Sequence, residues 1–235
     1  MRNLALFALG TLATAAMAVQ PTSPTSISIT GTSVQLASIA GTTVSNTSNS
    51  SNMALQNMAS NAGHITIAGY SSQTATTVGG QVKNEAVSRD DFANQNISSN
   101  AGDVEVARGG ISVQNSNMVN TNVMNKAQGG GADALQNLAS NNGEIKITGA
   151  SYQMVGSRDS TVRNDAAGSN ALATRNLSSN FGHVTIGGAS TQTTYLASAN
   201  ILNLANGANS HAAQNIASND ACNEPRDPCP DGRCR

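Results

Sequence analysis

Short stretches of alternating apolar and polar residues recur along the chain and predict its elements. In each stretch two β-branched residues flank one other residue, and a Gly follows shortly after them. Five copies of this block occupy residues 27–31, 65–69, 104–109, 145–149 and 184–188. Such alternation is typical of a strand with one buried face, whereas helical periodicity is weak and Gly and Asn recur where a helix needs better formers. The pattern therefore predicts an all-β fold.

Gln and Asn residues recur at fixed distances after each alternating block. The repeated Gln is Gln35, Gln73, Gln114, Gln153 or Gln192, and the Asn that follows 11 residues later is Asn46, Asn84, Asn125, Asn164 or Asn203. An Asn-x-(Ala/Ser)-Ser-Asn block then begins at Asn57, Asn96, Asn137, Asn176 or Asn215 and ends at Asn61, Asn100, Asn141, Asn180 or Asn219. The commonest period is 39 residues, as between Gln114 and Gln153. The third copy has two extra residues near 108–110, which indicates a bulge or a longer loop.

One repeat contains too few apolar residues to offset the loss of chain entropy by itself. Stacked in register, the repeats would pair their backbones at about 4.8 Å, and identical Asn and Gln side chains would form hydrogen-bonded ladders. We therefore predict a β-solenoid-like stack of five repeats of about 39 residues, cross-β and amyloid-like, with the Gln and Asn residues above as structural ladder positions. Two arrangements remain open: rungs that close into a solenoid within one chain, and rungs that stack only between chains.

Charged residues at equivalent repeat positions test this stacking. In a stack, Glu105 would lie beside Lys146, which is a favourable pair of opposite charges. At the position before the first β-branched residue, His64 beside Asp103 and Glu144 beside His183 are tolerable pairs, whereas Asp103 beside Glu144 is a poor one. Arg175 stands where the other repeats have Gln56, Gln95, Gln136 and Gln214. We interpret it as a variable, exposed rung position, with a binding contact as the alternative.

The composition favours a protein that associates. Aromatic residues make up 3% of the chain and charged residues 11%, and the net charge is −1. So small a net charge gives an electrostatic field too weak to hold nucleic acid or an anionic membrane. It also provides little repulsion between copies of the chain. His64 and His183 share one repeat position, which favours a structural role over catalysis or metal binding. We expect no enzyme activity, no cofactor and no metal.

Both termini differ from the repeats. Residues 1–18 resemble a secretory signal, with Arg2 before an apolar run and Ala18 at the cleavage site. Residues 19–25 form a short linker, 26–219 the five-repeat domain and 220–235 a Cys- and Pro-rich tail. In that tail Cys229 and Cys234 flank a Pro-Asp-Gly turn, so a disulfide is one interpretation, and an unstructured tail with incidental disulfides is the other. No later segment is expected to enter a membrane, so the mature chain is predicted to be secreted.

The repeat, Asn-x-(Ala/Ser)-Ser-Asn-x-Gly-x-(Ile/Val)-x-(Ile/Val)-x-Gly followed by Gln and Val-x-Asn-x-Ala, resembles those of the Fap-type bacterial functional amyloids. Segments 84–86 and 164–166 match well, and the resemblance covers most of the mature chain. It implies an exported fibre subunit of a biofilm matrix, with one β-solenoid layer per repeat. Fap-type subunits carry Cys-x-x-Cys near the C-terminus, whereas four residues separate Cys229 from Cys234 here. Curli subunits also have ladders of stacked Gln and Asn residues, but their repeat is shorter.

The leading hypothesis is thus a self-assembling subunit of an extracellular fibre. Its expected partners are further copies of itself, a related nucleator subunit and outer-membrane export machinery. One alternative is a monomeric secreted β-solenoid that binds a surface or a glycan, for which Tyr70, Tyr152 and Tyr195 would supply a row of aromatic side chains. The other is a minor nucleator of a different fibre subunit.

Overall fold

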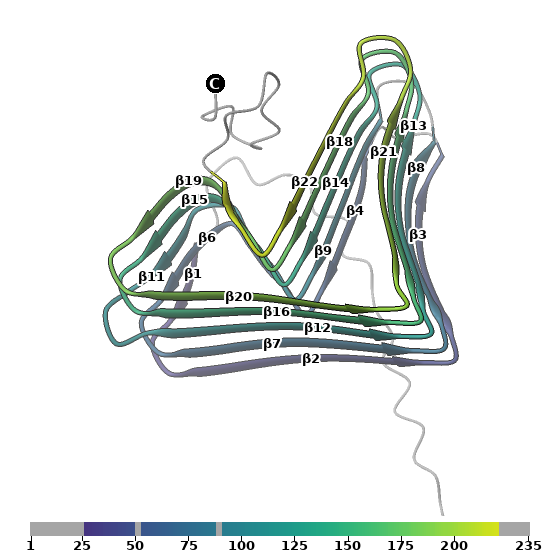
Figure 1. Ribbon diagram of the computed structural model, residues 1–235. Helices are drawn as coiled ribbons and strands as arrows, with labels where there is room; N and C mark the ends of the chain where they lie inside the picture. Colours follow the sequence, from purple (N-terminus) through teal and green to yellow (C-terminus); the bar gives the residue numbers. More distant parts are fainter. Residues whose placement is uncertain (1–25, 50–52, 88–90, 221–235) are drawn as a thin grey trace, which may run out of the picture.

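The computed structural model describes residues 26–49, 53–87 and 91–220 of the chain. The regular secondary structure of these residues consists of β-strands alone. The strands wind into a solenoid whose successive turns stack on one another (Figure 1). Each of the five turns contributes to four parallel sheets, three of them with five strands and one with eight. The predicted all-β stack of five repeats is therefore confirmed, and the turns close within a single chain.

The four sheets, which we name A to D in the order that the chain visits them, have the following strands. Sheet A contains β1 (Ser26–Ile29), β5 (Asn61–Ala62), β6 (His64–Ile67), β10 (Asn100–Ala101), β11 (Val104–Val106), β15 (Asn141–Ile147), β19 (Asn180–Ile186) and β23 (Asn219–Asp220). Sheet B contains β2 (Thr32–Ala40), β7 (Tyr70–Val78), β12 (Ile111–Val119), β16 (Ala150–Arg158) and β20 (Ala189–Ala197). Sheet C contains β3 (Thr43–Ser48), β8 (Gln81–Val87), β13 (Asn122–Gln128), β17 (Thr161–Ala167) and β21 (Asn200–Asn206). Sheet D contains β4 (Met53–Met58), β9 (Phe92–Ile97), β14 (Asp133–Leu138), β18 (Leu172–Leu177) and β22 (His211–Ile216).

In cross-section the long sheet B forms a straight base, from which sheet C rises (Figure 1). Sheet D returns along sheet C to the middle of the molecule, and sheet A then leads back to the start of sheet B. The space between sheets C and D is narrow, and its far end is filled by Ala side chains such as Ala86, Ala93 and Ala134. A second cluster, with Val82, Val123 and Leu138, joins sheets B, C and D. Small and branched side chains thus set the distances between the sheets.

Every repeat pairs with the next in the register that the sequence spacing predicts. Gln73 lies opposite Gln35 and Gln114, and Asn125 lies opposite Asn84 and Asn164. The two extra residues of the third repeat form a longer loop rather than a bulge within a strand. There the Gly110 N–H donates to Ala107 O at 2.8 Å. Pairing resumes immediately afterwards at Ile111.

The predicted signal peptide (1–18), the linker (19–25) and Cys229 and Cys234 of the tail lie outside the described residues. Among the residues that are described, no helix is long and apolar enough to cross a membrane.

Candidate assembly site: the amide ladders and the two ends of the solenoid

Two sets of amide side chains meet between sheets A and B. In each turn the repeated Gln of sheet B donates from Nε2 to the Oδ1 of an Asn of sheet A, as from Gln114 to Asn141 at 2.9 Å. Each of these Asn residues except the last, Asn219, in turn donates from Nδ2 to the Asn of the following turn. The Nδ2 to Oδ1 distances are 3.0 Å from Asn61 to Asn100, 2.9 Å from Asn100 to Asn141, 2.8 Å from Asn141 to Asn180 and 2.7 Å from Asn180 to Asn219. The ladder therefore binds turn to turn and also sheet to sheet.

A second ladder runs along the inner face of sheet C, through Asn46, Asn84, Asn125, Asn164 and Asn203, with Nδ2 to Oδ1 distances of 2.7–2.8 Å. The same Nδ2 groups also donate to backbone oxygens of sheet D. Asn125, for example, reaches Ala93 O at 2.9 Å and Leu135 O at 3.0 Å. This ladder therefore holds sheets C and D together.

A third ladder lies on the side of sheet D away from sheet C and has the opposite direction. Asn96 donates to Asn57 at 2.9 Å, and the series continues through Asn137 and Asn176 to Asn215. In this ladder each Nδ2 points to the preceding turn. In the ladders of Asn46 and Asn61 it points to the following turn.

Two further sets of ladder residues escaped the sequence reasoning. Gln95 donates to Gln56, and Gln136 donates to Gln95, each at 2.7 Å. The Ser hydroxyls of the repeated block bridge turns, since Ser99 Oγ donates to Ile97 O and to Asn137 O at 3.0 Å. The signal was present, because Ser recurs at its position in all five repeats and Gln at its position in four, but repetition alone does not show which way a side chain points.

The interpretation of Arg175 as an exposed rung position is wrong. Its side chain is fully buried between Gln136 and Gln214 of the neighbouring turns. Burial lowers the pKa of this guanidinium to about 9, because removal from water disfavours the charged form. Arg175 is buried because it lies on the inner face of sheet D. The spacing of residues in the sequence does not show whether a position is on the inner or the outer face of a strand.

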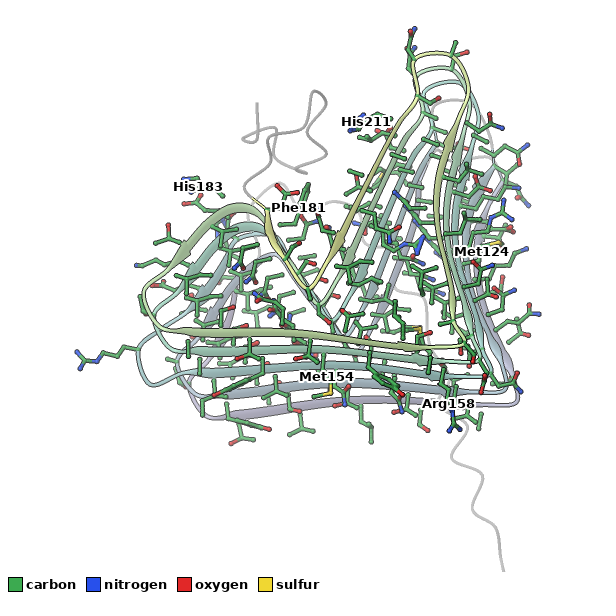
Figure 2. The ribbon with its side chains drawn as sticks, in the orientation of Figure 1. Met124, Met154, Arg158, Phe181, His183 and His211 are labelled. Carbon is green, nitrogen blue, oxygen red and sulfur yellow. The ribbon has the colours of Figure 1, made fainter. Side chains whose placement is uncertain are left out.

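The predicted charge pairs do form on the outer surface. Lys146 Nζ lies 3.0 Å from Glu105 Oε1, and His64 Nδ1 lies 3.0 Å from Asp103 Oδ2. His183 projects outward from sheet A in Figure 2, at the repeat position of His64. The tyrosines do not form the expected row: Tyr70, Tyr152 and Tyr195 share the outer face of sheet B but stand at different positions along their strands.

The two end turns differ from the middle turns in charge. Within residues 26–219, every Lys, Arg, Asp and Glu lies between Lys83 and Arg175. The first turn (residues 26–60) and the fifth (residues 180–218) contain none of them. The end turns are also where the sheets stop. Strands β2, β3 and β4 form one edge and β20, β21 and β22 the other.

The ladders make these two edges complementary. Their directions leave the Nδ2 groups of Asn203 and Asn219 at the C-terminal edge, where Asn203 Nδ2 also donates to Ala173 O and Ala213 O. At the N-terminal edge lie the Oδ1 groups of Asn46 and of Asn61, which is buried. The reversed ladder offers the opposite groups, Oδ1 of Asn215 and Nδ2 of Asn57. Each edge thus supplies donors where the other supplies acceptors.

No cluster of three or more His, Cys, Asp or Glu side chains suited to a metal ion occurs in the described part of the chain. The chain matches no family model, and comparisons with curated proteins and with solved structures give no significant match.

Proposed function

We propose that the chain is a secreted structural subunit, not an enzyme, which forms an extracellular fibre of the functional-amyloid type by stacking end to end. The observation that carries this proposal is the absence of Lys, Arg, Asp and Glu from both end turns. Soluble β proteins normally protect an open sheet edge with charge, Pro or a cap. Among the described residues, charge is confined to the turns that already have neighbours on both sides, with Asp220 of the edge strand β23 as the one exception.

The edges also fit each other head to tail. If the first turn of a second copy continued the stack beyond the fifth turn, Asn203 would donate to Asn46 and Asn219 to Asn61 of that copy, as each ladder does within the chain. Head-to-head contact would instead oppose like groups, acceptor to acceptor. A fibre of this kind is polar, and its seams repeat the internal spacing of about 4.8 Å.

The biological setting follows from the same proposal. A fibre of exported copies in a biofilm matrix agrees with the signal-like residues 1–18 and with the resemblance of the repeat to Fap-type subunits. Further copies are the principal partner, with a related nucleator and outer-membrane export machinery as additional ones. A minor nucleator would use the same edges.

One observation favours a second candidate, a monomeric solenoid that binds a glycan or another surface. Tyr70, Tyr152 and Tyr195 are all exposed on one face of sheet B. Exposed aromatic side chains on a flat face suit stacking against a ligand.

The test begins with the chain from residue 19 onward, incubated at micromolar concentration without denaturant. Electron microscopy should show filaments, and fibre diffraction should give reflections near 4.7 and 10 Å. A stable β-rich monomer that forms no filaments even after seeding would reject the fibre and leave the monomeric binder.

A pair of introduced lysines then tests the seam, which is the contact between the fifth turn of one copy and the first turn of the next. Thr47 lies beside Glu85 and Leu204 beside Asp165, on the outer face of sheet C, so Thr47→Lys and Leu204→Lys each gain a favourable neighbour within the chain. The two lysines would oppose each other only where a fifth turn meets a first turn. We expect the double variant to need a roughly two- to five-fold higher concentration to elongate than either single variant, which serves as its control.

A further inference from the structure

The outer face of sheet B is a flat surface almost without charge. Its strands are nine residues long, and the first, third, fifth, seventh and ninth residues of each point outward. Arg158 is the one charged residue among these outward positions, and it stands at the end of β16 (Figure 2). The outer faces of sheets A and C carry ion pairs instead, such as Glu105 with Lys146 and Lys83 with Glu85.

Large apolar side chains are exposed on this face. Leu36 is 71% exposed, Tyr195 65% and Met154 53%. Figure 2 shows Met154 projecting from the base of the molecule, away from the interior. Thr74 and Asn115 lie between Leu36 and Met154 across the strands, so the face mixes apolar and small polar side chains. Exposed apolar side chains on one almost uncharged face favour an interaction site.

We propose that this face binds the same face of a second copy, about a two-fold axis parallel to the solenoid axis. Such an axis sets each turn opposite the same turn of the partner and reverses the strand direction. The first residue of a strand then faces the ninth of its equivalent, the third faces the seventh, and the fifth faces itself. Interfaces of this isologous kind require a surface that complements itself.

The residues meet that requirement. Tyr152, third in β16, would face Gly156, the seventh residue and the one without a side chain. Arg158 at the ninth position would face the small Ala150 at the first. In each case a large side chain lies opposite a small one, as interdigitating sheets require.

The neighbouring strands pair apolar residues instead. In β12, Ile111 at the first position would face Val119 at the ninth. In β7, Tyr70 would face Val78 in the same way. Across the middle of the interface, Met154 would face its own equivalent, fifth in β16.

The area is that of a stable interface. Five strands about 4.8 Å apart, each of nine residues rising about 3.3 Å, cover roughly 700 Å² per copy. Two such faces bury roughly 1,400 Å², within the range of specific protein–protein interfaces. Because the two-fold axis runs along the solenoid, the pairing leaves both ends open, and it does not depend on end-to-end growth.

Crosslinking tests the symmetry. In a background with Cys222, Cys229 and Cys234 changed to Ser, Asn115→Cys places a thiol at the fifth position of β12. Facing sheets lie about 10 Å apart, so a bifunctional maleimide of about that span should join two copies at this position. Ile111→Cys is the control, since its equivalent would lie about 26 Å away along the strand. Mixing Ile111→Cys with Val119→Cys copies should restore the crosslink.

Charge reversal gives an independent readout in electron micrographs, the width of the filaments. Asn115→Lys would bring two lysines together across the axis and should give single filaments, where the unaltered chain gives pairs. An equal mixture with Asn115→Glu copies should restore pairs. Thr66→Lys, exposed on sheet A beside Glu105, is the control and should leave pairs intact.

Single filaments from the unaltered chain, with no crosslink at residue 115, would overturn this proposal and leave end-to-end growth standing. Crosslinked dimers without filaments would support the pairing and reject the fibre. Chains that stay uncrosslinked and bind glycan through sheet B would overturn the pairing.

Discussion

Arg175 occupies a position that holds Gln in the turns on either side of it. Below it, the amides of Gln95 and Gln136 pass hydrogen bonds from turn to turn. At Arg175 the ladder breaks: Nε and Nη2 of the guanidinium, and the Oε1 of Gln136, are buried without a hydrogen-bond partner among the described residues. A buried cation without a matching anion is costly, because here only one bond, from Nη1 to Val162 O at 3.2 Å, replaces its lost hydration.

We therefore expect Arg175→Gln to raise the free energy of unfolding by about 1–4 kcal/mol, since it removes the cation and restores the ladder. Denaturant unfolding of the monomer measures this change in the free energy of unfolding. Gln136→Arg, which stacks a second guanidinium beside the first, is the control and should lower stability. A loss of stability in Arg175→Gln would show that the arginine has a stabilising partner.

The lowered pKa of Arg175 gives this difference a pH dependence. Its pKa is about 9 in the folded chain and well above that in the unfolded chain, so folding opposes the charged form. The destabilisation by this charge has its full size below pH 9 and declines as the pH rises above 9, because the folded chain then loses the proton before the unfolded chain does. The stability advantage of Arg175→Gln should therefore shrink between pH 9 and pH 11. Measuring both chains at each pH cancels the pH effects that they share; an advantage that stays constant would contradict the lowered pKa of Arg175.

Among the elements, sheet A depends on a column of stacked glycines. Gly63, Gly102, Gly143 and Gly182 have φ angles of 118°, 113°, 127° and 125°. A Cβ added to Gly143 would overlap the backbone oxygen of Gly102. We expect Gly143→Ala to lower the free energy of unfolding by about 2–4 kcal/mol, through backbone strain and the overlap. In Gly130→Ala the added Cβ meets no atom within 4 Å, so this control should change stability little when both are unfolded in denaturant.

The strands and their register could be predicted from the sequence, because a ladder fold repeats the same residue types at the same spacing. The corner between sheets D and A could not. Ala59, Ser98 and Ala139 turn the chain there with positive φ, near +50°, yet none is a Gly that would mark such a turn. The direction of each amide ladder was equally hidden, because an Asn in a sequence does not show whether its Nδ2 points up or down the stack.

The contribution of a ladder residue also depends on its turn. Asn125 in the third turn is fully buried and bonds to turns on both sides. Asn203 in the fifth turn is half-buried, accepts from Asn164 and donates to Ala173 O at 3.0 Å and Ala213 O at 2.6 Å, but it has no following turn to bond. We expect Asn125→Ala to lower the free energy of unfolding of the monomer by about 2–4 kcal/mol, and Asn203→Ala to lower it by about 1 kcal/mol or less.

For Asn203→Ala the larger effect should appear in fibre growth, because the removed Nδ2 is one that the seam would use. Filament elongation measured beside monomer unfolding separates the two effects. Asn206→Ala, exposed at the end of the same strand, is the control. Normal elongation of Asn203→Ala would exclude this ladder from the seam.

At the scale of the whole molecule, a single proline should block growth at one end of a filament and leave growth at the other end unaffected. The His211 N–H donates to Ala171 O at 2.9 Å, and alternate residues of a parallel strand point to opposite neighbours. The N–H of Ala212 therefore points out of the C-terminal edge. Ala212→Pro removes that donor and keeps the bonds inside the chain, as an edge strand tolerates.

Because its N-terminal edge is intact, an Ala212→Pro copy should still add to the C-terminal end of a filament, and it should then block the next copy. A small fraction of this variant should consequently stop the growth of unaltered chains at that end, whereas Ala212→Ser should not. Labelled monomer added to immobilised seeds shows growth at each end separately. Unchanged growth in the presence of Ala212→Pro would mean that the open edge of β22 is not part of the seam, and a fibre built from these edges would have to be abandoned.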